Sequence, residues 1–196
     1  MPKVSDAHRA ARRTQILGAA VRCFARKGYR GTSMTDIIAE SGLSAGAIYG
    51  HFEGKQELFA AVAEQVLAAR EGDLEARHPD GTPLTPGELM RTLLDGFRRE
   101  PFSHVVVQLW SEAAIDPEIR RLANAVFVRL RATVTAQLVD WANAGPGRVT
   151  GDPEAWARRV APVVLAVAPG FMVQRAIVED FDDEGYLAAL AETLPH

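Results

Sequence analysis

Apolar residues recur at helical spacing near the start of the chain. From Asp6 to Lys27 they return every three or four positions, with arginine and glutamine between them. They are Ile16, Leu17, Ala20, Val21 and Phe24. This spacing predicts an amphipathic helix. Gly28 follows, and because glycine adopts a left-handed backbone without steric strain, we expect the helix to end there.

Two short helices are predicted next. Residues 31–33 (Gly-Thr-Ser) supply cap residues for a helix from Met34 to Ser41, and Gly42 breaks that helix. Ser44 is the cap of a third helix, Ala45 to His51. Two short helices joined by a glycine turn have the layout of a helix-turn-helix, whose second helix enters the DNA major groove. Helical hairpins with a glycine turn are also common in proteins that do not bind DNA.

The rest of the chain also has helical patterns. A fourth helix is predicted from Lys55 to about Arg70. The segment Glu71–Pro86 is rich in Gly, Pro, Asp and His, which favours a domain linker. Further helices are predicted at Gly87–Glu100, Ser103–Ala114, Pro117–Ala142, Glu154–Glu179 and Asp183–Thr193. Asp116-Pro117 and Asp152-Pro153 are the signals for two of these helix starts. Proline in the interior of Glu154–Glu179 should kink that helix or divide it near Pro169. No strand-length alternation of apolar and polar residues occurs, so the predicted fold is all-α.

Composition limits where the protein acts. A chain of 196 residues with 47% hydrophobic and 24% charged residues can bury a core. The apolar stretch from Val160 to Val173 contains prolines and a glycine and is too short to span a bilayer. The basic, polar start lacks the apolar core of a signal peptide. Cys23 is the single cysteine, which excludes an internal disulfide. We therefore expect a cytoplasmic protein with no membrane association.

Charge is unevenly distributed along the chain. Residues 1–55 hold nine Lys or Arg and four acids, a net charge of +5, so the remainder carries −8. A basic front end on an acidic body favours a phosphate-binding surface confined to the first quarter of the chain, although a solvated helix face gives the same composition. Arg9, Arg12 and Arg13 are either an arm that reaches a neighbouring DNA groove or a solvated arm.

An enzyme and an architectural DNA-binding protein are the alternative functions. Cys23 lies in the first amphipathic helix with no histidine at a matching position, as expected for an inert, packed thiol. The five histidines have no zinc-ligand spacing, and neither a nucleophile elbow nor a phosphate loop occurs. We therefore expect no catalytic residue, metal or cofactor. An effector-independent architectural protein would need a basic body rather than an acidic one.

Several residues at fixed spacing resemble the DNA-binding domain of the tetracycline-repressor (TetR) family. The similarity covers roughly Arg13 to Leu58. It rests on the run Gly28-Tyr29-Arg30-Gly31-Thr32-Ser33-Met34-Thr35-Asp36-Ile37, followed by Gly42-Leu43-Ser44, Gly46, Ile48-Tyr49, His51-Phe52 and Lys55-Gln56-Glu57-Leu58. The resemblance implies a homodimeric, all-helical regulator of transcription, a repressor that a small molecule releases from a palindromic operator of double-stranded DNA.

The resemblance also implies the domain plan and the DNA-binding residues. Residues 1–54 would form a three-helix DNA-binding domain and residues 55–196 a helical ligand-binding and dimerisation domain, with helix 55–70 connecting the two. The expected DNA contacts are Thr32, Ser33, Thr35, Ser44, Ala45, Gly46, Tyr49, His51 and Lys55. The ring of Tyr49 has packing as its alternative role, and His51 has helix capping. Ile38, Ala45 and Gly50 depart from the family's usual residues, and the last two reduce the reach toward DNA.

The C-terminal part holds aromatic and aliphatic residues beside a few polar ones, as a largely apolar small-molecule site requires. The expected ligand-binding residues are Phe97, His104, Gln108, Trp110, Phe127, Trp141, Phe171 and Gln174. Their alternative role is core packing. The last two predicted helices carry more apolar surface than a terminal pair normally exposes, which predicts a dimer interface. Its expected apolar residues are Val160, Val164, Val167, Phe171, Ile177, Tyr186, Leu187 and Leu190.

Overall fold

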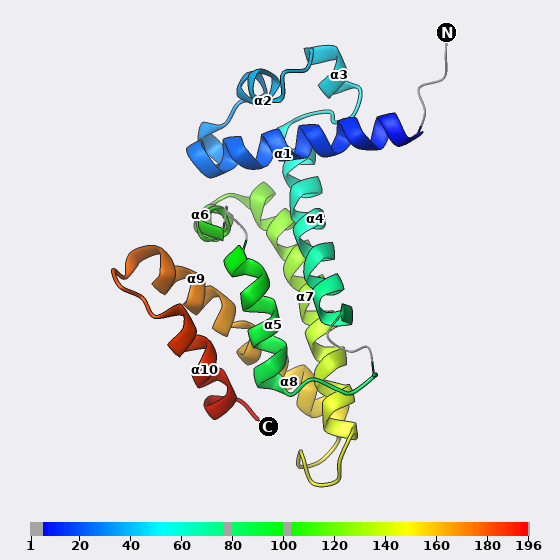
Figure 1. The fold of residues 1–196 in the computed structure, drawn as a ribbon, viewed down its shortest axis with the longest axis vertical. Helices are drawn as coiled ribbons and strands as arrows, with labels where there is room; N and C mark the ends of the chain where they lie inside the picture. The colour runs from blue at the N-terminus through cyan, green and yellow to red at the C-terminus, as the bar shows by residue number, and fades with distance from the viewer. Residues whose placement is uncertain (1–5, 77–79, 100–102, 196) are drawn as a thin grey trace. The chain divides into compact units, whose positions relative to one another are not determined.

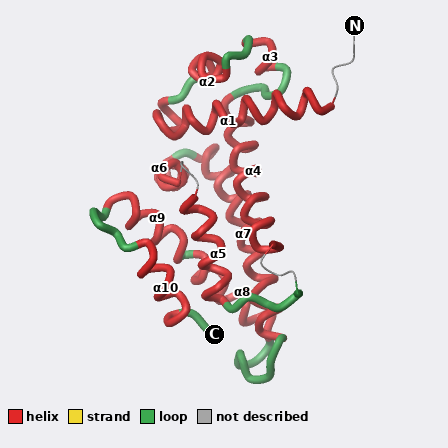
Figure 2. The backbone as a smooth tube through the Cα atoms, viewed as in Figure 1, coloured by secondary structure: helices red, strands yellow, loops and turns green. Residues whose placement is uncertain are grey.

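The computed structural model describes residues 6–76, 80–99 and 103–195, which form helices and loops only (Figures 1 and 2). The all-α prediction is therefore confirmed. The chain divides into two compact units, Met1–Val66 and Leu67–His196. The division falls inside helix α4, Lys55–Ala76, whereas the sequence analysis placed the domain boundary just before this helix. The predicted linker also began too early, because α4 continues six residues beyond Arg70.

The N-terminal unit contains α1 (Asp6–Gly31), α2 (Met34–Ser41), α3 (Ala45–Tyr49) and the first half of α4. Gly28 has the expected positive φ of 70°, but its ψ of 174° kinks α1, and one further helical turn follows. The hydroxyl of Thr32 donates to the carbonyls of Gly28 at 2.7 Å and Cys23 at 3.1 Å. These bonds satisfy backbone acceptors that the kink withdraws from the helix ladder.

The core of this unit is formed by the apolar faces of all four helices. Its fully buried side chains include Ile16, Phe24, Ile37, Ile48, Phe52 and Leu58. Phe24 and Phe59 pack edge to face with 5.4 Å between ring centroids, and Tyr29 lies 4.9 Å from Phe59. These aromatic contacts join the end of α1 to the start of α4 and so fix the frame on which α2 and α3 sit.

The C-terminal unit begins with the second half of α4 and continues through six further helices. They are α5 (Pro86–Arg99), α6 (Ser103–Ile115), α7 (Pro117–Asn143), α8 (Pro153–Leu165), α9 (Val167–Ile177) and α10 (Asp183–Thr193). Asp116 and Asp152 cap α7 and α8 through backbone N–H groups, and a proline follows each cap. These two Asp-Pro signals are confirmed as helix starts.

The predicted helix Glu154–Glu179 is two helices. The break lies at Ala166, three residues before Pro169. A proline ring clashes with the carbonyl four residues earlier, here that of Leu165, and such a clash kinks or breaks a helix. Pro162 lies inside α8 without dividing it. Pro169 is instead the third residue of α9. The first N–H groups of a helix have no partner within the helix, so the missing N–H of proline costs no hydrogen bond there.

The segment Pro153–Ile177 is by length and composition apolar enough to cross a membrane, a test that a core helix of a soluble protein also passes. Val164, Phe171 and Met172 within it are buried among the other helices of the unit.

Half of the apolar residues predicted for a dimer interface belong to the core of the single chain. Val164, Phe171, Leu187 and Leu190 are at most 4% exposed. They pack with α5, which crosses α10 so closely that a Cβ on Gly87 would lie 3.1 Å from the carbonyl oxygen of Leu190. The prediction of an interface formed by these four residues is therefore wrong. The apolar surface that α8 and α9 do expose lies at Val163, Val173, Ile177 and, just beyond α9, Val178.

Candidate nucleic-acid interface

A reciprocal cap fixes the start of α2. The backbone N–H of Asp36 donates to the Ser33 hydroxyl at 3.1 Å, and the carboxylate of Asp36 accepts from the backbone N–H of Ser33 at 2.8 Å. This is the capping box, formed here by Ser and Asp. Ser33 is exposed, and its hydroxyl also donates to the carboxylate of Asp36 at 2.7 Å.

The left-handed backbone conformation of Gly42 sets the direction of α3. Gly42 has φ 66° and ψ 15°, as a glycine C-cap requires, and the chain reaches Ser44 two residues later. The side chain of Ser44 accepts from the backbone N–H of Ala47 at 3.3 Å and begins α3. Helix α3 ends at Tyr49, two residues earlier than predicted, and Gly50 caps it. The helix-turn-helix geometry of α2 and α3 is thereby established by caps at each helix end.

One face of α3 is open. The side chain of Tyr49 is 52% exposed, and Ser44, Ala45 and Gly46 are exposed beside it. A Cβ added to Gly46 would meet no other atom of the chain within 4 Å, so the fold itself does not require glycine there. Ile48 points the other way and is fully buried. The tight turn and the buried isoleucine together present the remaining side chains of α3 outward.

Ion pairs clamp α2 to the second half of α1. Glu40 accepts from Arg22 and from Arg26, each at 2.6 Å, and Asp36 accepts from Lys27 at 2.6 Å. The hydrogen bond from Lys27, followed by those from Ser33, holds the pKa of Asp36 well below its ordinary value. The hydrogen bonds from Arg22 and Arg26 likewise lower the pKa of Glu40. Arg22/Arg26 and Asp36/Glu40 are each four residues apart, a complementary pattern that the sequence analysis overlooked.

Two of the predicted DNA contacts are engaged inside the unit. The Thr32 side chain is buried, with its hydroxyl on the α1 carbonyls. The Lys55 ammonium donates to the carbonyls of Tyr29 at 2.8 Å and Thr32 at 2.9 Å, and lies 4.4 Å from the centre of the Tyr29 ring. It therefore joins the end of α1 and the approach to α2 to the start of α4.

The other predicted contacts lie at the surface of the unit. Thr35 is exposed in the first turn of α2. His51 is half-buried in the turn after α3, with its ring 6.4 Å from that of the buried Phe52. With Ser33, Ser44, Ala45, Gly46 and Tyr49, they give seven of the nine predicted residues a half-buried or exposed position around α2 and α3.

The aromatic residues predicted to bind a ligand form separate ring contacts in the C-terminal unit. Trp110 packs against Phe127 with 6.0 Å between ring centres, whereas Trp141 pairs with Trp156. Phe171 packs in the core against Phe181 and Tyr186. Trp141 is buried, and its indole N–H has no acceptor among the described residues.

The remaining predicted ligand residues differ in exposure. Phe97 is half-buried, and Gln174 is exposed with its amide on the carbonyl of Gly170. The side chains of His104 and Gln108, in α6, lie outside the described residues.

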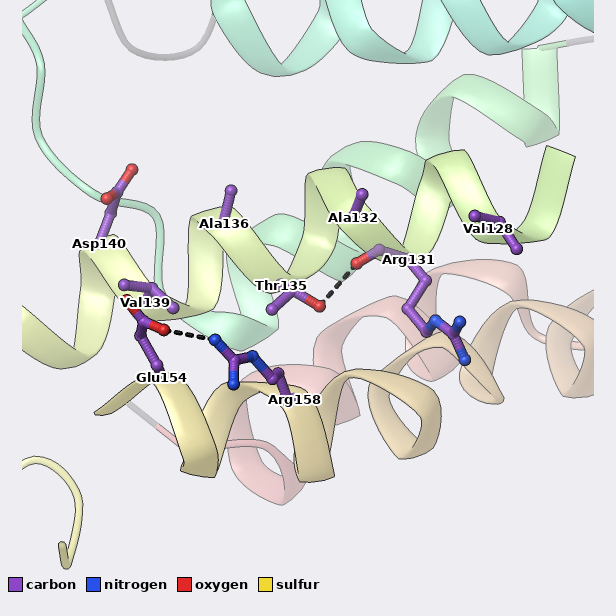
Figure 3. A pocket seen from close by; sticks show the side chains of 9 residues that line it. All are labelled: Val128, Arg131, Ala132, Thr135, Ala136, Val139, Asp140, Glu154 and Arg158. Atoms are coloured by element: carbon purple, nitrogen blue, oxygen red, sulfur yellow. Dashed lines mark hydrogen bonds and ion pairs between the residues drawn. The ribbon is translucent and has the colours of Figure 1, made fainter. Parts of the chain in front are cut away.

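A surface groove of about 520 Å³ lies between α7 and α8 (Figure 3). Small and apolar side chains of α7 line it, and the ion pair between Glu154 and Arg158 lies on its α8 side. The α7 residues are Val128, Arg131, Ala132, Thr135, Ala136, Val139 and Asp140. None of the predicted ligand residues lines this groove, which is therefore a different place from the predicted site.

A buried arginine was missed by the sequence analysis. Arg70 is 6% exposed, lies 3.4 Å from Asp73, and has its guanidinium 5.7 Å from the centre of the Phe97 ring. A Cβ on Gly96 would fall 1.7 Å from its Nη1 atom, so this glycine makes room for the guanidinium. Gly96 was the one sequence signal for the burial of Arg70, and it can be interpreted only when α4 and α5 are known to be neighbours.

Comparison with known proteins covers both units. Residues 16–62 match the family of bacterial regulatory proteins named after tetR, and residues 88–196 match the C-terminal domain of BetI-type transcriptional repressors. The transcriptional repressor AcnR of Corynebacterium jeikeium is 30% identical over 189 residues, 93% of each chain. A transcriptional repressor of Mycobacterium tuberculosis is 46% identical over 78 residues, which span 37% of this chain and 42% of that relative.

Solved structures agree with this assignment at the level of the fold. GusR of Salmonella enterica has a TM-score of 0.74 and 25% identity, over 97% of this chain and 96% of that one. A TetR-family regulator from Syntrophomonas wolfei has a TM-score of 0.78 at 19% identity, over 93% and 92%. The family consists of transcriptional regulators, which sets aside the alternative of a small helical enzyme. The chain belongs to the tetR family of bacterial regulatory proteins and is a DNA-binding transcriptional regulator.

Proposed function

We propose that the chain is a dimeric repressor whose α3 reads a palindromic operator and which a small molecule, bound in the C-terminal unit, releases from DNA. Regulators of this family bind operator DNA and act as dimers. The observation that carries the proposal is the open face of α3, with Tyr49 half exposed beside Ala45 and Gly46 on a helix fixed at both ends. Small residues allow the DNA backbone to approach closely, and the tyrosine hydroxyl donates to phosphate.

The proposed contacts form a continuous set around this face. Ser44 caps α3, and Ala45 and Gly46 begin it. Tyr49 is its last residue, and His51 lies in the turn beyond it. Ser33 and Thr35 stand at the start of α2. Lys55 contributes through its hold on the carbonyls of Tyr29 and Thr32. Thr32 has its hydroxyl turned inward and is the least suited of the set. Most of these contacts position the protein on phosphates and carry little sequence information.

The second copy is proposed to cover the apolar surface of α8 and α9. Val163 is 68% exposed and Ile177 is 75% exposed, and Val173 lies between them on the same stretch of chain. Side chains of this kind are more often found at interfaces than facing water. Two recognition helices related by a two-fold axis would then engage successive major grooves about 34 Å apart.

The effector is proposed to be a largely apolar molecule near the aromatic residues of the C-terminal unit. The pair of Trp110 and Phe127 is partly exposed, and the buried indole N–H of Trp141 is a donor that a ligand or an ordered water would satisfy. Helix α4 belongs to both units along the chain, so a ligand that moves its second half would also displace the first.

The test uses DNA that the protein selects for itself. Purified full-length protein captures genomic fragments of its source, the shared sequence is placed in a labelled duplex, and a metabolite library is screened for loss of binding. We expect a palindromic site and at least one small molecule that weakens DNA binding by about 5- to 150-fold, a coupling that operator DNA must impose equally on ligand binding. Retained fragments with no shared sequence would overturn the operator assignment. Ligand affinity that is unchanged by saturating operator would overturn the switch.

A further inference from the structure

Apart from Arg30 in its last turn, the cations of α1 fall into two groups. In the second half of the helix, Arg22 and Arg26 pair with Glu40, and Lys27 pairs with Asp36, so α2 neutralises them. In the first half, no described carboxylate pairs with Arg9, Arg12 or Arg13. Arg9, Arg12 and Arg13 thus gather positive charge without a pairing acid in residues 6–13, where Asp6 is the single acid and the helix dipole is also positive.

The first half of α1 is fixed to the helix-turn-helix on both sides of α3. Before α3, the side-chain amide of Gln15 donates to the carbonyl of Ser41 at 2.9 Å, and Arg12 in turn donates to Gln15 at 3.1 Å. After α3, the guanidinium of Arg13 lies 5.1 Å from the centre of the Phe52 ring. These arginines therefore stand on a helix that is tied to the chain on both sides of α3, and residues 6–13 form part of that helix rather than the predicted arm.

We propose that this end of α1 is a second DNA-binding surface, which holds the phosphates of the duplex just outside the bases that α3 reads. The proposal rests on the proposed function, because it needs α3 in the major groove. Duplex DNA is the partner that fits: the surface offers three cations without pairing acids, held in register with the reading helix, on a unit of positive net charge. Phosphate contacts of this kind strengthen binding to every sequence and fix the orientation of the protein.

The test compares two operator duplexes with two doubly substituted full-length proteins. One duplex ends at the half-site bases, and the other extends about five base pairs beyond each end. Arg9→Gln with Arg12→Gln removes the proposed contacts and leaves Arg13 on Phe52. Arg121→Gln with Arg131→Gln removes two exposed cations of α7 and is the matched control for net charge. Thermal unfolding and circular dichroism show whether each variant is folded.

On the long duplex we expect the Arg9/Arg12 variant to bind more weakly than the parent. The slope of log affinity against log salt should be shallower by about 0.9 for each phosphate that the variant no longer neutralises. The same weakening should appear with unrelated DNA of equal length, so the preference for operator stays unchanged. On the short duplex the variant and the parent should bind alike, and the Arg121/Arg131 control should follow the parent on both.

Three results would overturn the proposal. Parent-like affinity and salt slope of the variant on the long duplex would show that the arginines are merely solvated. Equal weakening on both duplexes would place their contacts within the half-sites. Parent-like DNA binding together with loss of an acidic protein partner would assign the surface to that partner. A parent protein that does not distinguish operator from unrelated DNA would instead contradict the proposed function, and that failure is seen without any variant.

Discussion

The candidate sites of the two units are built from different kinds of contact. In the N-terminal unit, short-range caps and ion pairs fix a small surface: Ser33 with Asp36, Ser44 with Ala47, and Glu40 with two arginines. In the C-terminal unit, the shape comes from an apolar core that draws on α5 and α7 to α10. A surface motif built from neighbours in sequence can be recognised residue by residue. A pocket assembled from distant helices cannot be recognised in this way, because each aromatic residue fits a core position as well as a pocket position.

The strongest test of this comparison removes α10. Ending the chain at Asp180 deletes Leu187 and Leu190, which are buried against α5 and α9. Each buried leucine is worth about 2–5 kcal/mol, and the two together approach the whole stability of a domain. We expect the C-terminal unit to lose its fold and the chain to lose operator binding, as measured by tryptophan fluorescence, light scattering and DNA titration. A chain that ends at Leu194 is the control, and a soluble, dimeric truncated protein would contradict the prediction.

A second test asks whether the pair of Trp110 and Phe127 binds the effector. Trp110→Ala should raise the effector concentration needed for half-release by about tenfold while ligand-free DNA affinity stays near that of the parent. Ile115→Ala removes a side chain that is 77% exposed at the end of the same helix and serves as the control. Release is measured by fluorescence anisotropy of a labelled operator, and urea unfolding accompanies it. Equal sensitivity of both variants to the effector would place the ligand elsewhere.

Lys55 tests whether a residue of the family motif acts on DNA or on the fold. Lys55→Met keeps the aliphatic stem beside Tyr29 and removes the donors to two carbonyls. Hydrogen bonds from a charged donor contribute about 1.5–3 kcal/mol, so the N-terminal unit should be destabilised by about that amount. The three tryptophans lie in the C-terminal unit, and hydrogen exchange of α1 is therefore the measurement. Unchanged exchange with weakened DNA binding would make Lys55 a phosphate ligand alone.

Tyr49 is the corresponding test on the open face. Tyr49→Phe removes one hydroxyl from a side chain that is 52% exposed, so stability should not change. If that hydroxyl donates to phosphate, affinity for operator and unrelated DNA should both fall, by about twofold to tenfold. Tyr186→Phe, in the C-terminal unit, removes a hydroxyl that donates to the carbonyl of Val167 and is the control. Weaker binding to operator alone would mean that Tyr49 reads a base.

These differences explain how far the sequence could be interpreted. Gly42, Ser44, Asp116 and Asp152 act locally, and each was predicted in the role that the structure gives it. The division of Glu154–Glu179 near Pro169 was also predicted, and the break lies at Ala166 because the proline clash falls on the preceding turn. Leu187 and Leu190 were expected at a dimer interface because periodicity shows that a face is apolar and does not show what covers it. Arg70 fits beside Gly96 only through a contact between helices, which no local pattern encodes.

The smallest expected effect comes from the ion pairs that join α2 to α1. The pKa values of Asp36 and Glu40 are lowered from 3.8 and 4.5 by their hydrogen bonds. Groups with depressed pKa values stabilise the fold above their unfolded values, and that contribution is lost as the pH falls through the folded values. Protection of α1 and α2 against hydrogen exchange should therefore decline as the pH falls below about 4.5.

The double variant Asp36→Asn with Glu40→Gln should be less protected than the parent at pH 7, and the two proteins should converge in acid. Both acids are partly exposed, so 0.5 M salt should reduce the difference between the two proteins at pH 7. An equally steep decline in the variant would show that other carboxylates set the acid sensitivity of this unit.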